Sequence, residues 1–229
     1  PSVIILSALF LSLHGASIRY NTAMLFALAF LPMFGIGGLT GLPLGLSSSD
    51  IPLHDTYYVI GHFHYVVAPG TIFALLAGVY YWYPKVTGRL MNETLGKIHF
   101  IGSFIFIYGI FMPMFIQGLA GMNRRLYDGG AQYAHVQGVL HWNTVMSWSA
   151  WGLFLFQIPF IINFFMSLKT GKQASSNPWE ATTLDWVATS SPPLAHGNFD
   201  TTPTVYRGPY DYSLPGAKTD FTPQTVEKA

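Results

Sequence analysis

Four long apolar stretches, separated by short polar segments, occupy most of the chain up to residue 168. Each has the ~20 residues that a helix needs to cross the ~30 Å hydrocarbon core of a membrane. They cover residues 22–44, 57–83, 98–119 and 141–168. Residues 1–13 are also apolar but too few, and we expect them to be the cut end of a helix that begins upstream. The pattern predicts an all-α fold, a polytopic transmembrane helix bundle with one truncated and four full spans in residues 1–168.

Glycine, proline and aromatic residues refine this prediction. The pair Pro69–Gly70 lies inside the second full span and predicts a bend or a locally unwound turn. The run Tyr80–Tyr83 closes that span and is typical of an aromatic belt at the membrane surface. Small residues that permit close helix contact gather in the first full span. They are Gly35, Gly37, Gly38 and Gly41. The polar segments 45–56 and 120–140 are predicted to be loops.

The character of the chain changes at Lys169. From there to Ala229 it is rich in Pro, Ser, Thr, Asp and Gly and has no long apolar run. We expect residues 169–229 to form an irregular, Pro-rich tail outside the membrane, which is either extended and held by partners or partly disordered.

Composition supports a membrane protein and excludes several other classes. Of the 229 residues, 51% are hydrophobic and only 9% are charged, whereas soluble domains are about a quarter charged. The net charge of +1 gives no bulk attraction to nucleic acid, so we expect lipid rather than nucleic acid as a partner. The absence of Cys excludes disulfides, thiolate metal sites and iron–sulfur clusters.

Lys and Arg are distributed unequally between the two ends of the predicted spans. One side carries Arg19, Lys85, Arg89, Lys97, Lys169 and Lys172. The other side carries only Arg124 and Arg125. The positive-inside rule places the first side, and with it the C-terminus, in the cytoplasm. The pair His54–Asp55 is then on the opposite side, together with Arg124 and Arg125.

The second full span contains two histidines, His62 and His64, and no other group between residues 57 and 83 that is charged at neutral pH. Ionisable residues inside a membrane are costly and usually functional. Positions two apart are about 200° apart around a helix, so the two rings point to nearly opposite sides. They cannot easily share one metal, but each suits an axial haem ligand. The alternative is that both are hydrogen-bonded packing residues.

Two charged pairs flank these spans. His54–Asp55 offers a nitrogen and a carboxylate, which form part of a site for Mg²⁺, an ion that keeps waters and other ligands. Alternatively, Asp55 or Thr56 caps the following helix. Arg124 and Arg125 suit bidentate contacts with carboxylates, or they anchor the chain to lipid headgroups.

Several of these motifs resemble subunit I of the haem–copper terminal oxidases, in the cytochrome c oxidase branch. The most specific motif is His54–Asp55–Thr56–Tyr57–Tyr58 followed by His62–Phe63–His64–Tyr65. The resemblance continues through residues 13–15, 37–41, 97–100, 118–122 and 124–125. In the tail, residues 177–184 and 190–193 are similar to bacterial members.

The resemblance implies a role for each of these residues. His62 would be the proximal ligand of the high-spin haem (haem a3 type) at the catalytic centre, and His64 an axial ligand of the low-spin haem (haem a type). His54 and Asp55 would bind Mg²⁺ or Mn²⁺ together with a ligand from subunit II. The remaining implied positions surround the haems. Arg124 and Arg125 would pair with the haem propionates, Asp50 would lie near them on the proton-exit side, and Phe63 would lie between the haems.

The resemblance also implies the activity. The chain would be the C-terminal part of the catalytic subunit I of a bacterial cytochrome c oxidase, a multi-pass protein of the inner membrane that acts with subunits II and III. It would reduce O₂ to water with electrons from cytochrome c and translocate protons. The CuB ligands and the second low-spin haem ligand are expected upstream of this sequence, so these residues alone are not expected to be active. The family's K-path lysine aligns with Ile5.

Two other functions are compatible with the residues. A quinol-oxidising member of the same superfamily would share these motifs, because the donor site lies mostly outside this sequence. A non-catalytic membrane haem carrier would need histidines a few turns apart on two helices, and this chain places one close pair on a single helix.

Overall fold

The computed structural model describes residues 1–187, 189–208, 211 and 221–227. They divide into two compact units. The first comprises Pro1–Val79 and Glu93–Ile161, and the second comprises Tyr80–Asn92 and Ile162–Ala229. The first unit contains all the candidate ligands named above.

Four helical segments are long and apolar enough to cross a membrane, which confirms the predicted all-α bundle. They are α2 (Thr22–Leu44), the continuous segment α4–η1–α5 (Tyr57–Tyr65, Val66–Ile72, Phe73–Thr87), α6 (Glu93–Leu119) and α7 (His141–Thr170). The described residues contain no strand, only two isolated bridges. The short helix α1 (Ser2–Leu13) precedes them and buries none of its residues.

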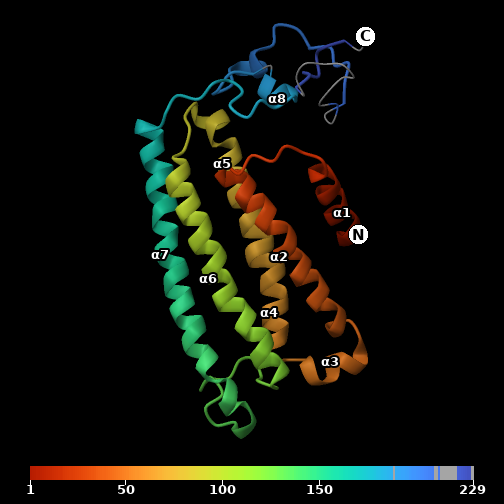
Figure 1. Cartoon of the computed structure of the whole chain (residues 1–229), viewed down its shortest axis with the longest axis vertical. Coiled ribbons are helices and arrows are strands. Elements are labelled where there is room, and N and C mark those ends of the chain that lie inside the picture. Colours follow the sequence, from red (N-terminus) through yellow and green to blue (C-terminus); the bar gives the residue numbers. More distant parts are fainter. Residues whose placement is uncertain (188, 209–210, 212–220, 228–229) are drawn as a thin grey trace. The chain divides into compact units, whose positions relative to one another are not determined.

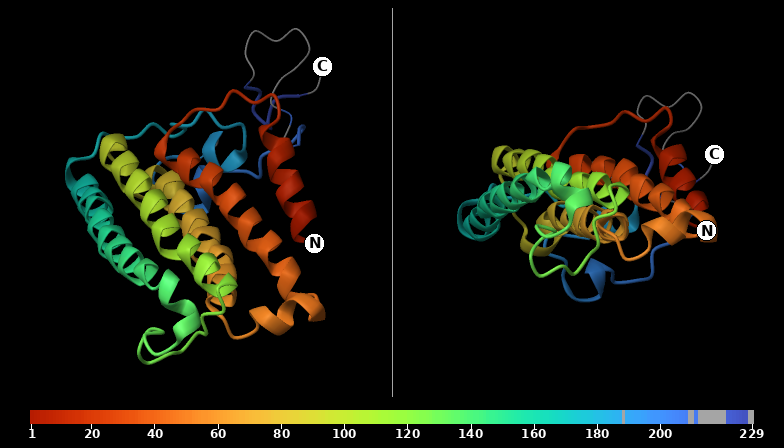
Figure 2. Two further views of the ribbon diagram at one scale, coloured as in Figure 1. Left: turned by 60° about the horizontal axis from the view of Figure 1, so that its bottom comes forward. Right: turned by 90° about the horizontal axis from the view of Figure 1, so that it is seen from below.

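Within the first unit, α4 lies between two neighbours (Figure 1). It packs against α2 on one side and against α6 on another, and α2 also contacts η1. The part of α7 up to Ile161 lies along α6 (Figure 2). Gly102 of α6 makes this approach possible, because a Cβ there would lie 1.9 Å from Phe156 Cδ1. Small residues therefore set the helix spacing, as membrane packing requires.

The long helix that carries the histidines widens in its middle. Residues 66–72, which include Pro69 and Gly70, form a π-helical segment, η1. Proline removes a backbone donor and clashes with the preceding turn, and a wider turn relieves both problems. The predicted local unwinding at Pro69–Gly70 is therefore confirmed, and it lies directly after the His62–His64 pair.

Several elements differ from the prediction. The second and fourth spans end at Thr87 and Thr170 and not at 83 and 168, and the predicted loop 120–140 contains a short 3-10 helix, η2 (Ala134–Val139). Helix α6 begins at Glu93, ahead of the predicted residue 98, because the Glu93 carboxylate accepts hydrogen bonds from the Thr22 backbone N–H at 2.9 Å and hydroxyl at 2.8 Å. The segment predicted as a loop at 45–56 contains a short helix, α3 (Ser47–Leu53), with Asp50 in its first turn. A carboxylate in that position is favoured by the helix dipole.

In the second unit, the tail is ordered by aromatic contacts. Its short elements are α8 (Leu184–Val187) and η3 (Ala195–Asn198). Trp186 is fully buried, and its ring stacks on Trp82 with 5.3 Å between centroids. Trp179 stacks in the same way on Tyr81 at 5.8 Å. Two residues of the predicted aromatic belt, Tyr81 and Trp82, therefore also pack against the tail, while the Trp82 side chain remains 41% exposed.

Candidate functional site

His62 projects from α4 towards α2. Its Nδ1 lies 2.7 Å from the carbonyl oxygen of Gly37. A carbonyl can only accept, so Nδ1 carries the proton in this bond and Nε2 of the neutral ring has a free lone pair. Gly41 makes room for the ring, because a Cβ there would lie 2.7 Å from His62 Cε1.

His64 has the same hydrogen-bonding arrangement in a different setting. Its Nδ1 lies 2.8 Å from the carbonyl oxygen of Ile60, one turn earlier in the same helix. Its ring stacks on Phe111 of α6, with 4.6 Å between centroids and 16° between planes. The two histidines therefore face different helices, as their spacing predicts. Phe63, between them in sequence, is exposed.

These contacts test whether the histidines fit haem ligation. Metal-bound histidine usually donates its other ring N–H to a carbonyl or carboxylate, which fixes the tautomer and the ring orientation. Both rings satisfy this requirement through Nδ1. Neither Nε2 has a hydrogen-bond partner among the described residues. A packing histidine in an apolar setting would be expected to use both nitrogens, so the arrangement fits an axial ligand at each Nε2.

Among the described residues, no group of three or more His, Cys, Asp or Glu side chains is placed to hold a metal ion by itself.

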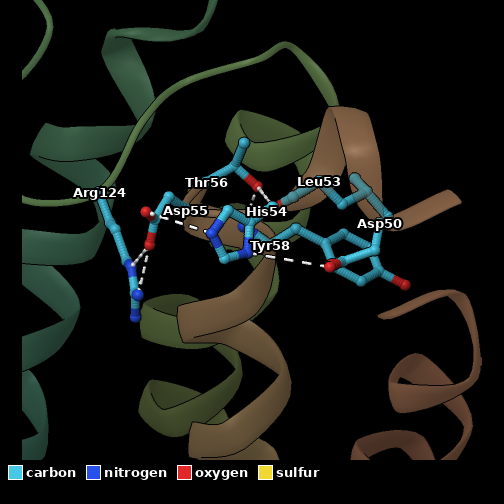
Figure 3. A network of polar contacts seen from close by, with 7 residues as sticks. All are labelled: Asp50, Leu53, His54, Asp55, Thr56, Tyr58 and Arg124. Atoms are coloured by element: carbon cyan, nitrogen blue, oxygen red, sulfur yellow. Dashed lines mark hydrogen bonds and ion pairs between the residues drawn. The ribbon is translucent and has the colours of Figure 1, made fainter. Parts of the chain in front are cut away.

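A second polar site is formed where the segment before α4 meets the segment after α6 (Figure 3). The Arg124 side chain donates from Nε to Asp55 Oδ1 at 2.7 Å, and its Nη2 contacts the same oxygen. The Arg124 backbone N–H donates to the Asp55 carbonyl at 2.8 Å, and the Tyr57 N–H donates to the Met122 carbonyl at 2.9 Å. Backbone and side-chain bonds thus join the two segments.

This junction holds two residues in an uncommon backbone conformation. Asp55 has φ 58° and Arg125 has φ 65°, which lie in the left-handed region that costs a non-glycine residue of the order of 1–3 kcal/mol. Directly after Asp55, Thr56 begins α4: its Oγ1 accepts from the Tyr58 N–H at 3.3 Å. Of the two predicted cap residues, Thr56 is therefore the one that caps the helix, and Asp55 remains available for other contacts.

His54 lies between two carboxylates, as Figure 3 shows. Its Nε2 is 3.5 Å from Asp55 Oδ2, and its Nδ1 is 3.8 Å from Asp50 Oδ2. The side chains of His54 and Asp55 are 68% and 55% exposed. A nitrogen and a carboxylate oxygen this close, with open space for water, fit two ligands of an incomplete Mg²⁺ or Mn²⁺ site.

The charge of Asp55 is favourable for this role. The hydrogen bond from Arg124 lowers the pKa of the Asp55 carboxyl group most strongly; desolvation opposes this shift, and the nearby charges of Arg124, His54 and Arg125 lower the pKa further. The carboxylate is therefore ionised at neutral pH, with Oδ1 bound to Arg124 and Oδ2 directed to His54.

The predicted site residues thus fall into two groups. His62 and His64 lie in α4, one to two turns after its start at Tyr57, and His54, Asp55, Asp50 and Arg124 form the polar site (Figure 3). The side chain of Arg125 is exposed, and it has no hydrogen bond or ion pair to another described residue. Sequence reasoning did not foresee the pairing of Arg124 with Asp55. It also treated Gly37 and Gly41 as helix-contact residues and as part of the family motif, and it did not place them beside His62.

Comparisons with known proteins show which family the chain resembles. The family model described as cytochrome c and quinol oxidase polypeptide I matches residues 1–186. The cytochrome c oxidase subunit 1 of Synechocystis sp. is 48% identical over 205 residues, which are 89% of this chain and 35% of the relative. The quinol oxidase subunit 1 of Bacillus subtilis is 36% identical over 225 residues, 95% of this chain and 33% of that relative.

A third relative and one solved structure are also similar to this chain. The alternative cytochrome c oxidase subunit 1 of Bradyrhizobium diazoefficiens is 43% identical over 93% of this chain and 36% of its own length. The chain therefore spans about a third of the length of these relatives. A heme-copper terminal oxidase dimer solved by cryo-EM shares the fold, with a TM-score of 0.57 over 66% of this chain and 27% of that one, at 19% identity.

The four apolar helices and these matches make the chain an integral membrane protein. The match of the family model to most of its length, together with relatives in which the same segment is nearly half identical, identifies the chain as a member of the cytochrome c and quinol oxidase polypeptide I family.

Proposed function

We propose that the chain belongs to the oxygen-reducing subunit I of a cytochrome c oxidase, which passes electrons from cytochrome c to O₂, forms water and translocates protons. The observation that carries the proposal is the histidine pair. Two imidazoles on one helix each donate Nδ1–H to a carbonyl and face different neighbouring helices. The relatives named as cytochrome c oxidases reach 48% identity, against 36% for the quinol oxidase, which favours cytochrome c as donor.

His62 and His64 would hold two haems through Nε2. The haems, when bound, would supply electron transfer and the iron at which O₂ is reduced. The chain's own contribution is to place a proton at Nδ1 of each ligand and to fix the ring orientation through the Nδ1 hydrogen bond, so that Nε2 faces the metal. By family resemblance, His62 serves a high-spin haem of a3 type beside CuB, and His64 serves a low-spin haem of a type.

The polar site would have two further roles. His54 and Asp55 would provide two ligands for Mg²⁺ or Mn²⁺, and subunit II would complete the site. Arg124 has its Nε and Nη2 on Asp55, so its Nη1 is left for a haem propionate, and the exposed Arg125 would contact another. Asp50, next to His54, would belong to the same propionate side.

The proposed cellular setting follows from the charge count. The excess of Lys and Arg on the side of the tail supports a cytoplasmic C-terminus in a bacterial inner membrane. Subunits II and III would be the partners, since part of the metal site and the donor site lie outside this chain.

The test is a reduced-minus-oxidised visible spectrum, with and without CO, of membranes that contain the assembled complex. We expect His62→Ala to remove the CO-sensitive bands and His64→Ala to remove the low-spin bands. His99→Ala is the matched control: His99 is fully buried in α6, but its Nε2 lies 3.0 Å from the Gln157 side chain, so both haem signals should persist.

Two results would contradict the proposal. The first is a folded wild-type complex without haem bands, and the second is bands that survive both substitutions. The electron donor is tested separately, by comparing oxidation of reduced cytochrome c with oxidation of a quinol. Faster turnover with the quinol would favour the quinol-oxidising function.

A further inference from the structure

The hydroxyl of Thr40 lies next to the hydrogen bond that orients His62. Thr40 is in α2, between Gly37 and Gly41 in sequence, and its Oγ1 is 3.3 Å from His62 Nδ1. The same Oγ1 is 2.8 Å from the Ile36 carbonyl oxygen and 2.9 Å from the Gly37 carbonyl oxygen. Three groups that need hydrogen-bond partners therefore converge on the Nδ1 side of the ring.

The protons can be assigned because both carbonyls only accept. The single hydroxyl proton of Thr40 must go to a carbonyl of its own helix, a common bond for threonine inside helices. Thr40 Oγ1 can therefore only accept a hydrogen bond from His62 Nδ1–H. The Nδ1–H group donates to Gly37 at 2.7 Å and has a longer branch to Thr40 at 3.3 Å, a three-centre arrangement seen elsewhere in proteins.

We propose, on the basis of the proposed function, that Thr40 is a positioning residue that tunes His62. A second acceptor on Nδ1–H increases the electron density of the imidazole and the basicity of Nε2. A more basic ligand stabilises the oxidised iron and lowers the reduction potential of the haem that it binds. Gly41 supports this arrangement, because only a glycine lets the ring lie this close to α2.

The other histidine provides an internal comparison. Among the residues that the structure describes, His64 Nδ1 has one acceptor, the Ile60 carbonyl. No hydroxyl of a described residue lies within hydrogen-bond distance of His64 Nδ1, in contrast to Thr40 at His62. The effect of Thr40 should therefore be confined to the CO-reactive haem, and the low-spin haem serves as a reference in the same sample.

The experiment compares Thr40→Val with Thr40→Ser in the assembled complex. Valine keeps the shape of threonine without the hydroxyl, and serine keeps the hydroxyl. We expect Thr40→Val to raise the potential of the CO-reactive haem by up to ~59 mV, a tenfold change in the equilibrium constant for one electron. The iron–histidine stretching frequency in resonance Raman spectra should fall. Thr40→Ser should stay close to wild type, and the low-spin haem should not change.

Each other result has a defined meaning. Loss of the CO-reactive haem in Thr40→Val but not in Thr40→Ser would also support the inference. An unchanged potential in Thr40→Val, equal shifts in both haems, or equal effects of valine and serine would overturn it while leaving the proposed function intact. A wild-type complex without haem bands would overturn the proposed function itself.

Discussion

Asp55 and Arg124, 69 positions apart in sequence, are joined by two different kinds of bond: backbone N–H to carbonyl at 2.8 Å, and guanidinium to carboxylate at 2.7 Å. The backbone bond fixes the distance between the segments before α4 and after α6, and the ion pair neutralises the carboxylate beside His54. This junction places the candidate metal ligands and the arginine pair at one end of the helix bundle.

The first prediction concerns the pH dependence of this junction. Arg124 lowers the pKa of Asp55 in the folded chain below its ordinary value of ~3.9. A lowered pKa means that the pair stabilises the fold above that value and that the contribution disappears as the pH falls through the lowered pKa. Arg124→Gln should therefore lower the melting temperature at pH 7, and the difference from wild type should shrink at the lowest pH that the complex tolerates.

The control for this prediction is Arg125→Gln. Arg125 acts on Asp55 only as a nearby charge and makes no hydrogen bond to it. Its substitution should have a smaller effect than Arg124→Gln at every pH. A constant difference between wild type and Arg124→Gln across the titration would show that the lost backbone geometry, and not the charge, is responsible.

The second prediction concerns the contact between Gly41 and His62. A Cβ at position 41 would lie 2.7 Å from His62 Cε1, so Gly41→Ala should displace the ring and weaken the CO-sensitive signal while leaving the low-spin signal. Gly38→Ala is the matched control, since a Cβ there meets no atom within 4 Å. Equal spectra for the two variants would contradict the close contact.

The third prediction concerns Gly118, where α6 meets the start of α4. A Cβ there would lie 2.1 Å from the Tyr58 backbone nitrogen, which cannot rotate away. Gly118→Ala should therefore separate the two helices and destabilise the fold by about 1–3 kcal/mol, the usual cost of overpacking. Gly78→Ala, with nothing within 4 Å, is the control in a thermal unfolding series. Stabilisation by both alanines alike would show that helix propensity dominates at these sites.

The fourth prediction concerns Lys85 in the second unit. Its buried Nζ donates to the carbonyls of Ser176 and Thr189 at 3.0 Å each, and to the Thr189 hydroxyl at 2.9 Å. It also lies 4.7 Å from the centre of the Trp186 ring. Lys85→Met would leave these acceptors without a donor, a loss of about 1–3 kcal/mol.

The measurement for Lys85 is limited proteolysis of the membrane complex. The tail around residues 174–190 should be cut several times faster in Lys85→Met than in wild type, because the tail has lost its main polar attachment. Lys169→Met, at an exposed lysine of α7, should leave the rate unchanged. Equal rates in both variants would assign the attachment of the tail to the tryptophan contacts alone.

Sequence reasoning was most successful where the signal is local. The apolar run 22–44 coincides with α2 because its limits are set by polar residues and glycine in the chain itself. Pro69 correctly predicted a disturbed helical turn, which the structure shows as the π segment η1. The spacing of His62 and His64 correctly predicted that the two rings face different helices.

The features that the sequence did not reveal depend on partners far away along the chain. Glu93 looks like an ordinary loop residue until Thr22 is seen to donate to it. Tyr81 and Trp82 have the composition of a membrane belt, and only the folded tail shows that Trp179 and Trp186 cover them. The Asp55–Arg124 ion pair was missed for the same reason: the two residues are 69 positions apart, and the sequence around either one does not indicate the other.

The π segment at Val66–Ile72 changes how the long helix can be altered by evolution or design. A wider turn holds more residues per turn than the α-helix on either side, so it shifts the angular register of everything after it. Because the wider turn takes up about one residue more than an α-helical turn, removing one residue there would let a regular α-helix form while Phe73 and its successors keep nearly the same direction relative to His62. A one-residue deletion within this segment should therefore be tolerated better than a deletion elsewhere in the long helix, where every residue that follows would turn by about 100°.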